Sequence, residues 1–234
     1  MKFQKTALAT LAAIGLAVVS TQASAFSVSV QTGTAVSTQA SVDQIDLGNT
    51  AVVGAPGSFG DVVYSGTTAG GLGYSFADGS LYTAAVPSVT AAPVGSTGAF
   101  WSVGNYPSTQ VGPGELTFSG TGALYVGFLW GSVDSYNTVT FWSGVTQLGS
   151  YTGSYALNPA NGNQSASGQV YFNAFSTSGQ AITRITFASP LQNAFETDNF
   201  AVTAVPEPET YAMLLAGLGL MGTIVRRRNK SKAA

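Results

Sequence analysis

Apolar and polar residues alternate with a period of two along most of the chain between Phe26 and Val205. The alternation is strict in residues 26–30, 116–118 and 139–141, where β-branched, leucine or aromatic side chains occupy every second position. This pattern is typical of strands with one buried and one solvent-facing side. Strands are therefore predicted over residues 26–30, 61–65, 74–76, 99–103, 116–118, 123–130, 138–142, 145–151, 169–175, 182–187 and 195–203.

The predicted strand at residues 123–130 is nearly all apolar, which indicates that both of its faces are covered. The polar segment 131–137 follows it and predicts a hairpin into the strand at 138–142. Residues 157–168 are polar throughout and predict a long loop. Short strands separated by turn residues, without a long helical period, indicate an all-β fold. We expect an antiparallel β-sandwich, jelly-roll-like, over residues 26–204.

The N-terminal segment has the three regions of a secretory signal peptide. Lys2 and Lys5 precede an apolar stretch at residues 7–19, and the small residues Ala23 and Ala25 follow it. Signal peptidase accepts small residues at these two positions before its cleavage site. We therefore expect residues 1–25 to form a signal helix that is removed after Ala25.

The C-terminal segment has the pattern of a short membrane helix. Fifteen apolar or small residues at 211–225 are followed by Arg226, Arg227 and Arg228. As a helix this stretch spans only about 22 Å, less than the roughly 30 Å hydrocarbon core. The arginines can reach the headgroups and favour the cytoplasmic side, which leaves the rest of the chain outside. A transmembrane helix at about residues 210–225, with a basic tail from 226, is therefore predicted.

Pro206, Glu207 and Pro208 precede this stretch, and the two prolines favour an extended backbone just outside the membrane. The proline-acid tripeptide, the Gly-rich apolar stretch and the arginine run together resemble the PEP-CTERM sorting signal of Gram-negative bacteria, over residues 205–230. The resemblance implies recognition and removal of the tail by an exosortase, a membrane protease found in organisms that often make exopolysaccharide and biofilm matrix. The alternative is a permanent single-pass anchor.

Two internal segments, residues 126–142 and 195–200, are similar to a group of exosortase-dependent surface proteins with one β-rich ectodomain. That similarity implies a class of protein and adds no catalytic residue.

Composition excludes several functional classes. The chain has no histidine and no cysteine, so His-dependent triads, thiolate metal sites and disulfides are excluded. Between Phe26 and Val205 it has one basic residue, Arg184, against eight acidic residues. A nucleic-acid partner is excluded because phosphate binding requires a basic surface.

Three residues near the last predicted strand, Glu196, Asp198 and Asn199, could supply oxygen ligands to a structural calcium ion, together with Asp43 and Asp46 near another strand. No other cofactor is expected. The alternative is that Asp198 and Asn199 cap a turn by bonding backbone amides, which short polar side chains do readily.

Aromatic residues provide a second candidate site, because exposed rings stack on sugars. Most of them lie in predicted strands and are expected in the core, which leaves Tyr106 and Tyr136 as candidate glycan platforms. The full set is Trp101, Tyr106, Trp130, Tyr136, Trp142, Tyr151 and Tyr155. A glycoside hydrolase would need two carboxylates in one concave, aromatic-lined cleft, and no pair is marked by its spacing.

The sequence thus predicts an exported protein without catalytic activity. It passes the inner membrane, is held there transiently by its tail, and ends at the cell surface or outside the cell. The ectodomain is expected to be structural or adhesive, with a carbohydrate-binding module for exopolysaccharide as the alternative.

Overall fold

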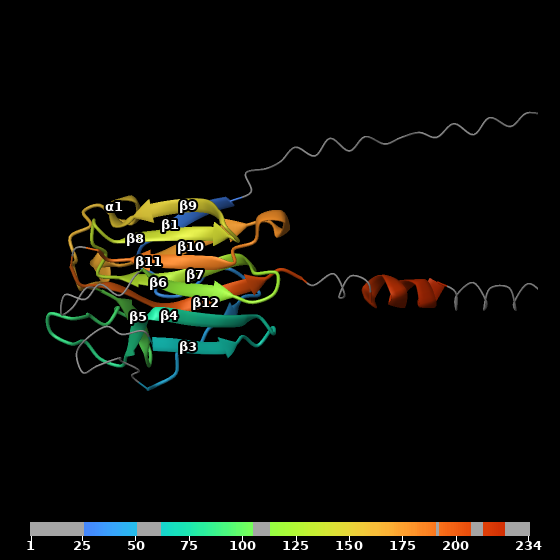
Figure 1. The fold of residues 1–234 in the computed structure, drawn as a ribbon, viewed down its shortest axis with the longest axis horizontal. Coiled ribbons are helices and arrows are strands. Elements are labelled where there is room, and N and C mark those ends of the chain that lie inside the picture. Colours follow the sequence, from blue (N-terminus) through green and yellow to red (C-terminus); the bar gives the residue numbers. More distant parts are fainter. Residues whose placement is uncertain (1–25, 51–61, 105–112, 191, 207–212, 223–234) are drawn as a thin grey trace, which may run out of the picture.

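Twelve strands form the folded part of the chain in the computed structural model, which describes residues 26–50, 62–104, 113–190, 192–206 and 213–222. All the pairings between these strands are antiparallel (Figure 1). The strands are β1 (Phe26–Gln31), β2 (Asp43–Gln44), β3 (Val62–Thr67), β4 (Gly73–Tyr82), β5 (Phe100–Val103), β6 (Gly114–Phe118), β7 (Ala123–Gly131), β8 (Thr138–Ser143), β9 (Thr146–Thr152), β10 (Val170–Ser176), β11 (Arg184–Ala188) and β12 (Phe195–Ala204).

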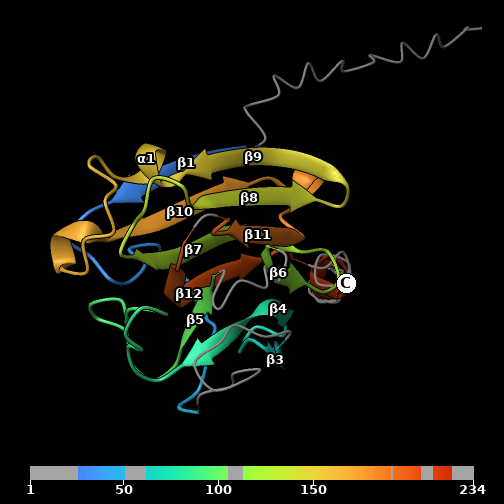
Figure 2. The ribbon, with the colours of Figure 1, turned by 60° about the vertical axis from the view of Figure 1, so that its left-hand side comes forward.

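The strands follow one continuous path, β1-β10-β7-β12-β5-β4-β6-β11-β8-β9, with β2 beside β12 and β3 beside β4. Strand β4 joins two layers, because Tyr74–Ala77 pair with β6 while Ser80–Tyr82 pair with β5. The path folds back on itself until its ends approach each other (Figure 2), and Phe26 of β1 lies 6.5 Å from Tyr151 of β9 between ring centroids. The result is a nearly closed antiparallel sheet.

Aromatic side chains fill the space between the two layers. Phe128 of β7 contacts Phe172 of β10 and Phe200 of β12 in its own layer, at 5.6 Å in both cases. It also meets Phe187 of β11 in the opposite layer edge-to-face at 5.5 Å. Trp130 and Phe195 stack at 4.3 Å. The core therefore depends on rings contributed by strands far apart in the sequence.

Strand β7 is buried on both faces, as its apolar sequence predicts. Phe128, Leu129 and Trp130 are all fully buried. Phe128 and Trp130 face the core, whereas Leu129 lies on the outer face of the same layer. Its outer face is covered by loops: the Tyr125 hydroxyl lies 2.7 Å from the Ser37 hydroxyl, and Pro93 lies over Gly131.

The prediction of an antiparallel all-β fold is confirmed, but the hairpin between residues 123–130 and 138–142 is wrong. β7 pairs with β10 and β12, whereas β8 pairs with β9 and β11 in the opposite layer. The polar segment 132–137 therefore crosses between layers. Both edges of β7 are paired with β10 and β12, so β8 finds its partners, β9 and β11, in the other layer. The jelly-roll assignment itself stays a prediction.

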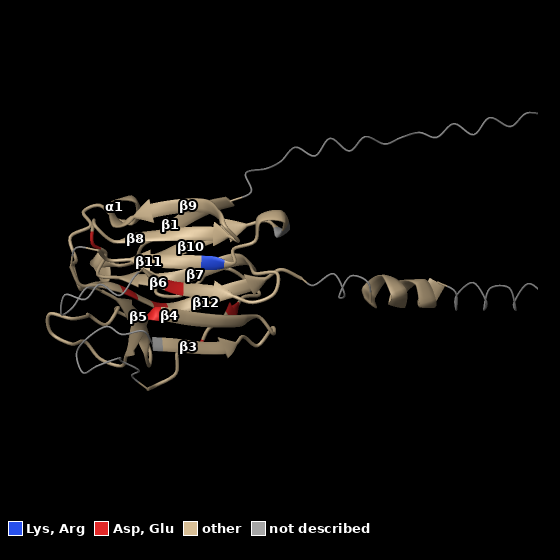
Figure 3. Cartoon of the chain, viewed as in Figure 1, with Lys and Arg blue, Asp and Glu red and all other residues tan. Residues whose placement is uncertain are grey.

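Charges are sparse over the domain, with blue confined to β11 in Figure 3. Arg184 pairs with Glu115 at 2.7 Å and lies 4.7 Å from the centre of the Trp142 ring. The short helix α1 (Gly153–Ala156) precedes the predicted loop at 157–168, and a 3₁₀ turn (Ala166–Gly168) forms the last residues of that loop. A second 3₁₀ turn covers Ser178–Gln180. Tyr155 lies in α1 and is 56% exposed, so its predicted place in the core is wrong.

Strand β12 ends where the predicted sorting tail begins. The Val205 N–H donates to the Gly122 carbonyl at 3.1 Å, and the Thr121 hydroxyl donates to the Val205 carbonyl at 3.4 Å. A separate helix covers residues 213–222, and its large apolar side chains are exposed. Within the described part of the chain, no helix has both the length and the apolar character needed to cross a bilayer. The transmembrane helix at 210–225, part of which lies outside the described residues, stays a prediction.

Candidate functional site

A long connection between β4 and β5, residues 83–99, lies over the outer face of the sheet; we call it the covering loop. Strand β12 supplies the side chains that hold it. Phe195 faces the core, so Glu196 and Asp198 point to the opposite face at the period of two. A bulge then follows between Asp198 and Ala201, with Asn199 at φ 48°, and it returns Phe200 to the core.

Glu196 is buried beneath the covering loop, with 2% of its surface exposed. The Ala91 N–H donates to its Oε1 at 2.9 Å, and the Ser132 hydroxyl lies 2.6 Å from its Oε2. Burial raises the pKa of Glu196 from 4.5 to about 8; the bonds from Ser132 and Ala91 oppose this rise, and the charge of Asp134 adds to it. Burial therefore favours the protonated form of this carboxyl group near neutral pH.

Asp198 holds the other half of the covering loop. The Ser96 hydroxyl donates to its Oδ2. Burial raises the pKa of Asp198, whereas the hydrogen bonds from Ser96 and from the Asn199 and Thr97 backbone lower it in part. The Asn199 amide group donates to the carbonyls of Ala35 and Gly95 at 2.8 and 3.2 Å. Asp198 and Asn199 therefore bind the covering loop and the segment around Ala35, and the turn-capping alternative stays a prediction.

The acidic side chains proposed as calcium ligands do not form a cluster in this arrangement. The carboxylate oxygens of Glu196 and Asp198 accept hydrogen bonds from separate parts of the covering loop. Of the two other proposed contributors, Asp43 accepts from the Thr68 hydroxyl and the Gly70 N–H at 2.9 and 2.8 Å, and Asp46 accepts from the Gly48 N–H at 2.8 Å. Among the described residues, no group of three or more acidic side chains is placed to hold a metal ion. Calcium binding stays an untested prediction.

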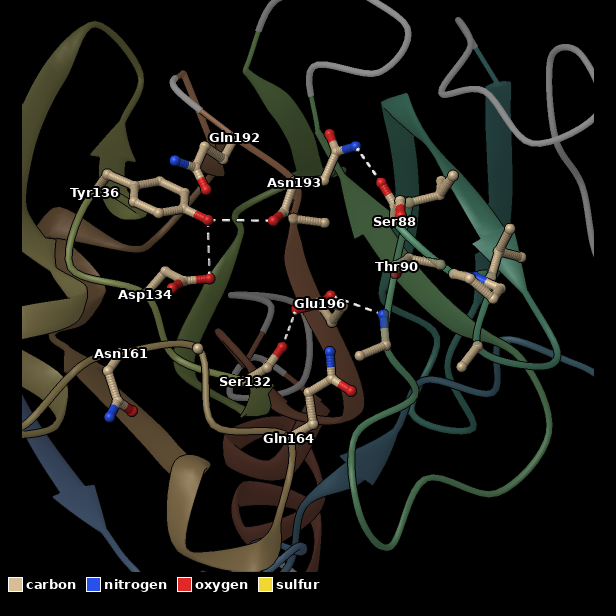
Figure 4. Close-up of a pocket in the computed structure, with 17 residues that line it drawn as sticks. Ser88, Thr90, Ser132, Asp134, Tyr136, Asn161, Gln164, Gln192, Asn193 and Glu196 are labelled. Carbon is tan, nitrogen blue, oxygen red and sulfur yellow. Dashed lines mark hydrogen bonds between the residues drawn. The ribbon is translucent and has the colours of Figure 1, made fainter.

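A cavity of about 720 Å³ opens beside Glu196, between the covering loop and the segments around Ser132 and Asn193 (Figure 4). Its floor contains Ser132 and Glu196, and one wall is the covering loop from Ala85 to Ala91. Asp134 and Tyr136 form the opposite wall. The exposed amide side chains of Asn161, Gln164 and Gln192 line the rim.

Tyr136 is held in this wall by its hydroxyl group. The hydroxyl donates to Asp134 Oδ2 at 2.9 Å, and the Asn193 carbonyl lies 3.2 Å away (Figure 4). Burial raises the pKa of both side chains; the carboxyl of Asp134 and the charge of Glu196 add to the rise for Tyr136, whereas the Tyr136 bond lowers the pKa of Asp134. Tyr136 is half-buried, so part of its ring borders the cavity.

The structure separates the aromatic residues predicted from sequence. Trp101 and Trp130 are fully buried, as expected, and Tyr136 reaches the cavity. Tyr106 lies outside the described residues. Sequence reasoning missed the covering loop and Asp134, because nothing in the spacing shows that residues 85–91 return to β12. The only sequence signal was Asp134 itself, two positions before a tyrosine in a polar crossing segment.

Two carboxylates, Asp134 and Glu196, thus share one concave site with a single aromatic side chain. This meets part of the requirement for a glycoside hydrolase. Glu196, however, has both oxygens engaged by Ser132 and Ala91 and is almost completely covered. Its observed contacts hold the covering loop in place, because Oε1 accepts from Ala91 and Oε2 accepts from Ser132.

The second functional segment begins at Pro206, directly after the last backbone bond of the domain. A family profile described as the PEP-CTERM protein-sorting motif matches residues 204–229. The chain carries a PEP-CTERM sorting motif. Comparison with curated proteins and with solved structures gives no significant match.

The PEP-CTERM motif confirms the resemblance drawn from Pro206, Glu207 and Pro208. It implies an exported protein that is targeted to an exosortase, passes the membrane and ends at the cell surface or outside the cell. Of the predicted sorting and processing residues, only Pro206 belongs to the described part of the chain. Glu207, Pro208, the arginines at 226–228, Ala23 and Ala25 lie outside it.

Proposed function

We propose that this PEP-CTERM protein is a non-catalytic structural or adhesive component of the cell surface or extracellular matrix. In this proposal, signal peptidase removes residues 1–25, and the segment 210–225 holds the chain in the inner membrane transiently. Exosortase then cleaves near Pro206–Glu209 and releases a jelly-roll-like domain. The observation that carries the proposal is the motif at residues 204–229, placed directly after β12 completes the fold.

The geometry at the end of β12 supports the proposed processing. Val205 is bonded to Thr121 and Gly122, so the folded domain ends at the residue before the motif's first proline. The core residues of the described chain lie between Ile45 and Val202, which means that removal of the tail takes no packed side chain from the core. The domain can therefore persist after cleavage.

Replacement of the tripeptide tests this function. In the variant Pro206→Ala, Glu207→Ala, Pro208→Ala, we expect the full-length chain to accumulate in the membrane fraction. The unaltered chain should appear shortened at the surface or in the medium. Ser231→Ala with Lys232→Ala, outside the matched residues, is the control and should be processed normally. Equal release of the tripeptide variant would contradict the proposal.

The cavity favours a second candidate function, binding of carbohydrate, including exopolysaccharide. Its polar rim and the half-buried Tyr136 offer hydrogen-bonding groups together with one aromatic surface, the usual combination in sites for small polar ligands. Loss of glycan binding in a Tyr136→Ala variant that retains its fold would support this function. Unchanged glycan binding in that variant would remove the cavity from consideration.

Absence of catalysis is part of the proposal. Its support is the engagement of both Glu196 oxygens by Ala91 and Ser132, which leaves the buried carboxyl without access to a scissile bond. Incubation with oligosaccharides should give no shortened products. Products that disappear in a Glu196→Gln variant would show the protein to be an enzyme.

A further inference from the structure

The rim of the cavity offers hydrogen-bonding groups that the described part of the protein leaves unused. The residues Asn161, Gln164 and Gln192 lie at this rim (Figure 4), and their side chains form no hydrogen bond with any other described residue. Each amide has both donors and an acceptor, so it can match a hydroxyl group, which also donates and accepts. A ligand with many hydroxyl groups satisfies such a rim better than an apolar ligand does.

The cavity has no positive charge to pair with an anion. Its described lining contains the carboxyl groups of Asp134 and Glu196 and neither lysine nor arginine. Arg184 lies outside the lining and is already paired with Glu115. A uronate or sulfate group that entered would lose its hydration without a counterion and would meet the charge of Asp134, which is unfavourable.

The walls offer one flat aromatic surface and a short apolar surface. Tyr136 lies on one side with its hydroxyl fixed by Asp134, which keeps the ring in one orientation. Val86 and Pro87 of the covering loop line the other side. A pyranose ring has apolar C–H faces and a polar edge, so it can pack on Tyr136 while its hydroxyls reach the rim. About 720 Å³ is within the roughly 300–1,000 Å³ typical of ligand sites.

We propose that this cavity binds uncharged or amino-bearing saccharide units and excludes anionic ones, with Tyr136 as the stacking surface and Asp134 as the excluding charge. The proposal rests on the carbohydrate-binding function above and adds the ligand class and the residues that select it. Amino sugars are included because their ammonium group can pair with Asp134.

A glycan array with neutral, amino-bearing, uronate-containing and sulfated oligosaccharides tests the selection. The full chain is purified in a polyoxyethylene detergent, because a detergent with a sugar headgroup would compete for the site. We expect neutral or amino-bearing glycans to bind at least tenfold more tightly than anionic glycans of the same length. Gln164→Lys, which adds a cation at the exposed rim, should reduce this preference at least threefold.

Gln147→Lys is the matched control, because Gln147 is an exposed residue of β9 outside the cavity lining and the charge change is the same. It should leave the preference unchanged; an equal effect of both lysines would overturn the site assignment. Equal binding of anionic and neutral glycans by the unaltered chain would overturn the charge selection and leave carbohydrate binding intact. Failure to bind any glycan would overturn carbohydrate binding and, with it, this inference.

Discussion

Replacement of Glu196 by glutamine should change how the stability of the domain depends on pH. Glutamine has the shape of the protonated carboxyl group: its oxygen can accept from the Ala91 N–H, and its amide group can donate to the Ser132 hydroxyl. The native contacts at 2.9 and 2.6 Å can therefore be retained. What the substitution removes is the ionised form, which the buried site disfavours.

The magnitude follows from the difference in pKa between the unfolded and folded chains. Burial raises the pKa of Glu196 from 4.5 to about 8. Between these values the folded chain binds a proton that the unfolded chain has released, so the free energy of unfolding falls as the pH rises. At roughly 1.4 kcal/mol per pH unit, the total loss is about 5 kcal/mol. The stabilisation is complete below pH 4.5 and is lost as the pH rises through 8.

Chemical denaturation of residues 26–206 at several pH values measures this effect, with fluorescence of the buried Trp101 and Trp130 as the signal. Below pH 4.5 the variant should match the unaltered domain within about 1 kcal/mol. Above pH 8 the variant should be the more stable of the two by several kcal/mol. Glu115→Gln is the matched control; it breaks a partly exposed ion pair with Arg184 and should cost about 1 kcal/mol or less near neutral pH. If the free energy of unfolding changed with pH in the same way for Glu196→Gln and for the unaltered domain, the reasoning would be refuted.

Three further perturbations test the core, the acidic side chains of β12 and the junction with the tail. Phe172→Ala should lower the free energy of unfolding by about 3–5 kcal/mol, because Phe172 is fully buried against rings of both layers; a loss below about 1 kcal/mol would contradict this packing. Millimolar calcium should leave the melting temperature unchanged, since Asp198 is bonded to Ser96; a clear rise would revive the calcium site. A flexible insertion between Val205 and Pro206 should speed tail removal by freeing the motif from the domain, and an unchanged rate would show that the junction imposes no limit.

The positions of many strands could be predicted from sequence, because each depends on a pattern within a few consecutive residues. Alternation in residues such as Phe26–Gln31 fixes a strand and its buried face, and the apolar run of β7 correctly indicated burial on both sides. Pairing is not local. The hairpin after β7 was wrong because turn residues at 131–137 have the same sequence signal whether the chain folds back within one layer or crosses to the other.

The candidate site was predictable only in part, for the same reason. Tyr136 was identified because it lies in a turn-like segment outside the predicted strands, and Glu196 because its carboxyl group lies beside Asp198 and Asn199 as a candidate calcium ligand. Their common location depends on the covering loop, which returns to Glu196 across 105 residues of sequence through the Ala91 N–H. The periodicity of apolar residues does not predict a contact between segments so far apart in the sequence. The sorting motif, in contrast, is contiguous and was recognised residue by residue.

The intact mass of the protein recovered from the cell surface or medium tests the central claim most directly. Removal of both ends predicts a chain that begins at Phe26 and ends near Pro206–Glu209. A surface-recovered chain that retains Arg226, Arg227 and Arg228 would contradict the account.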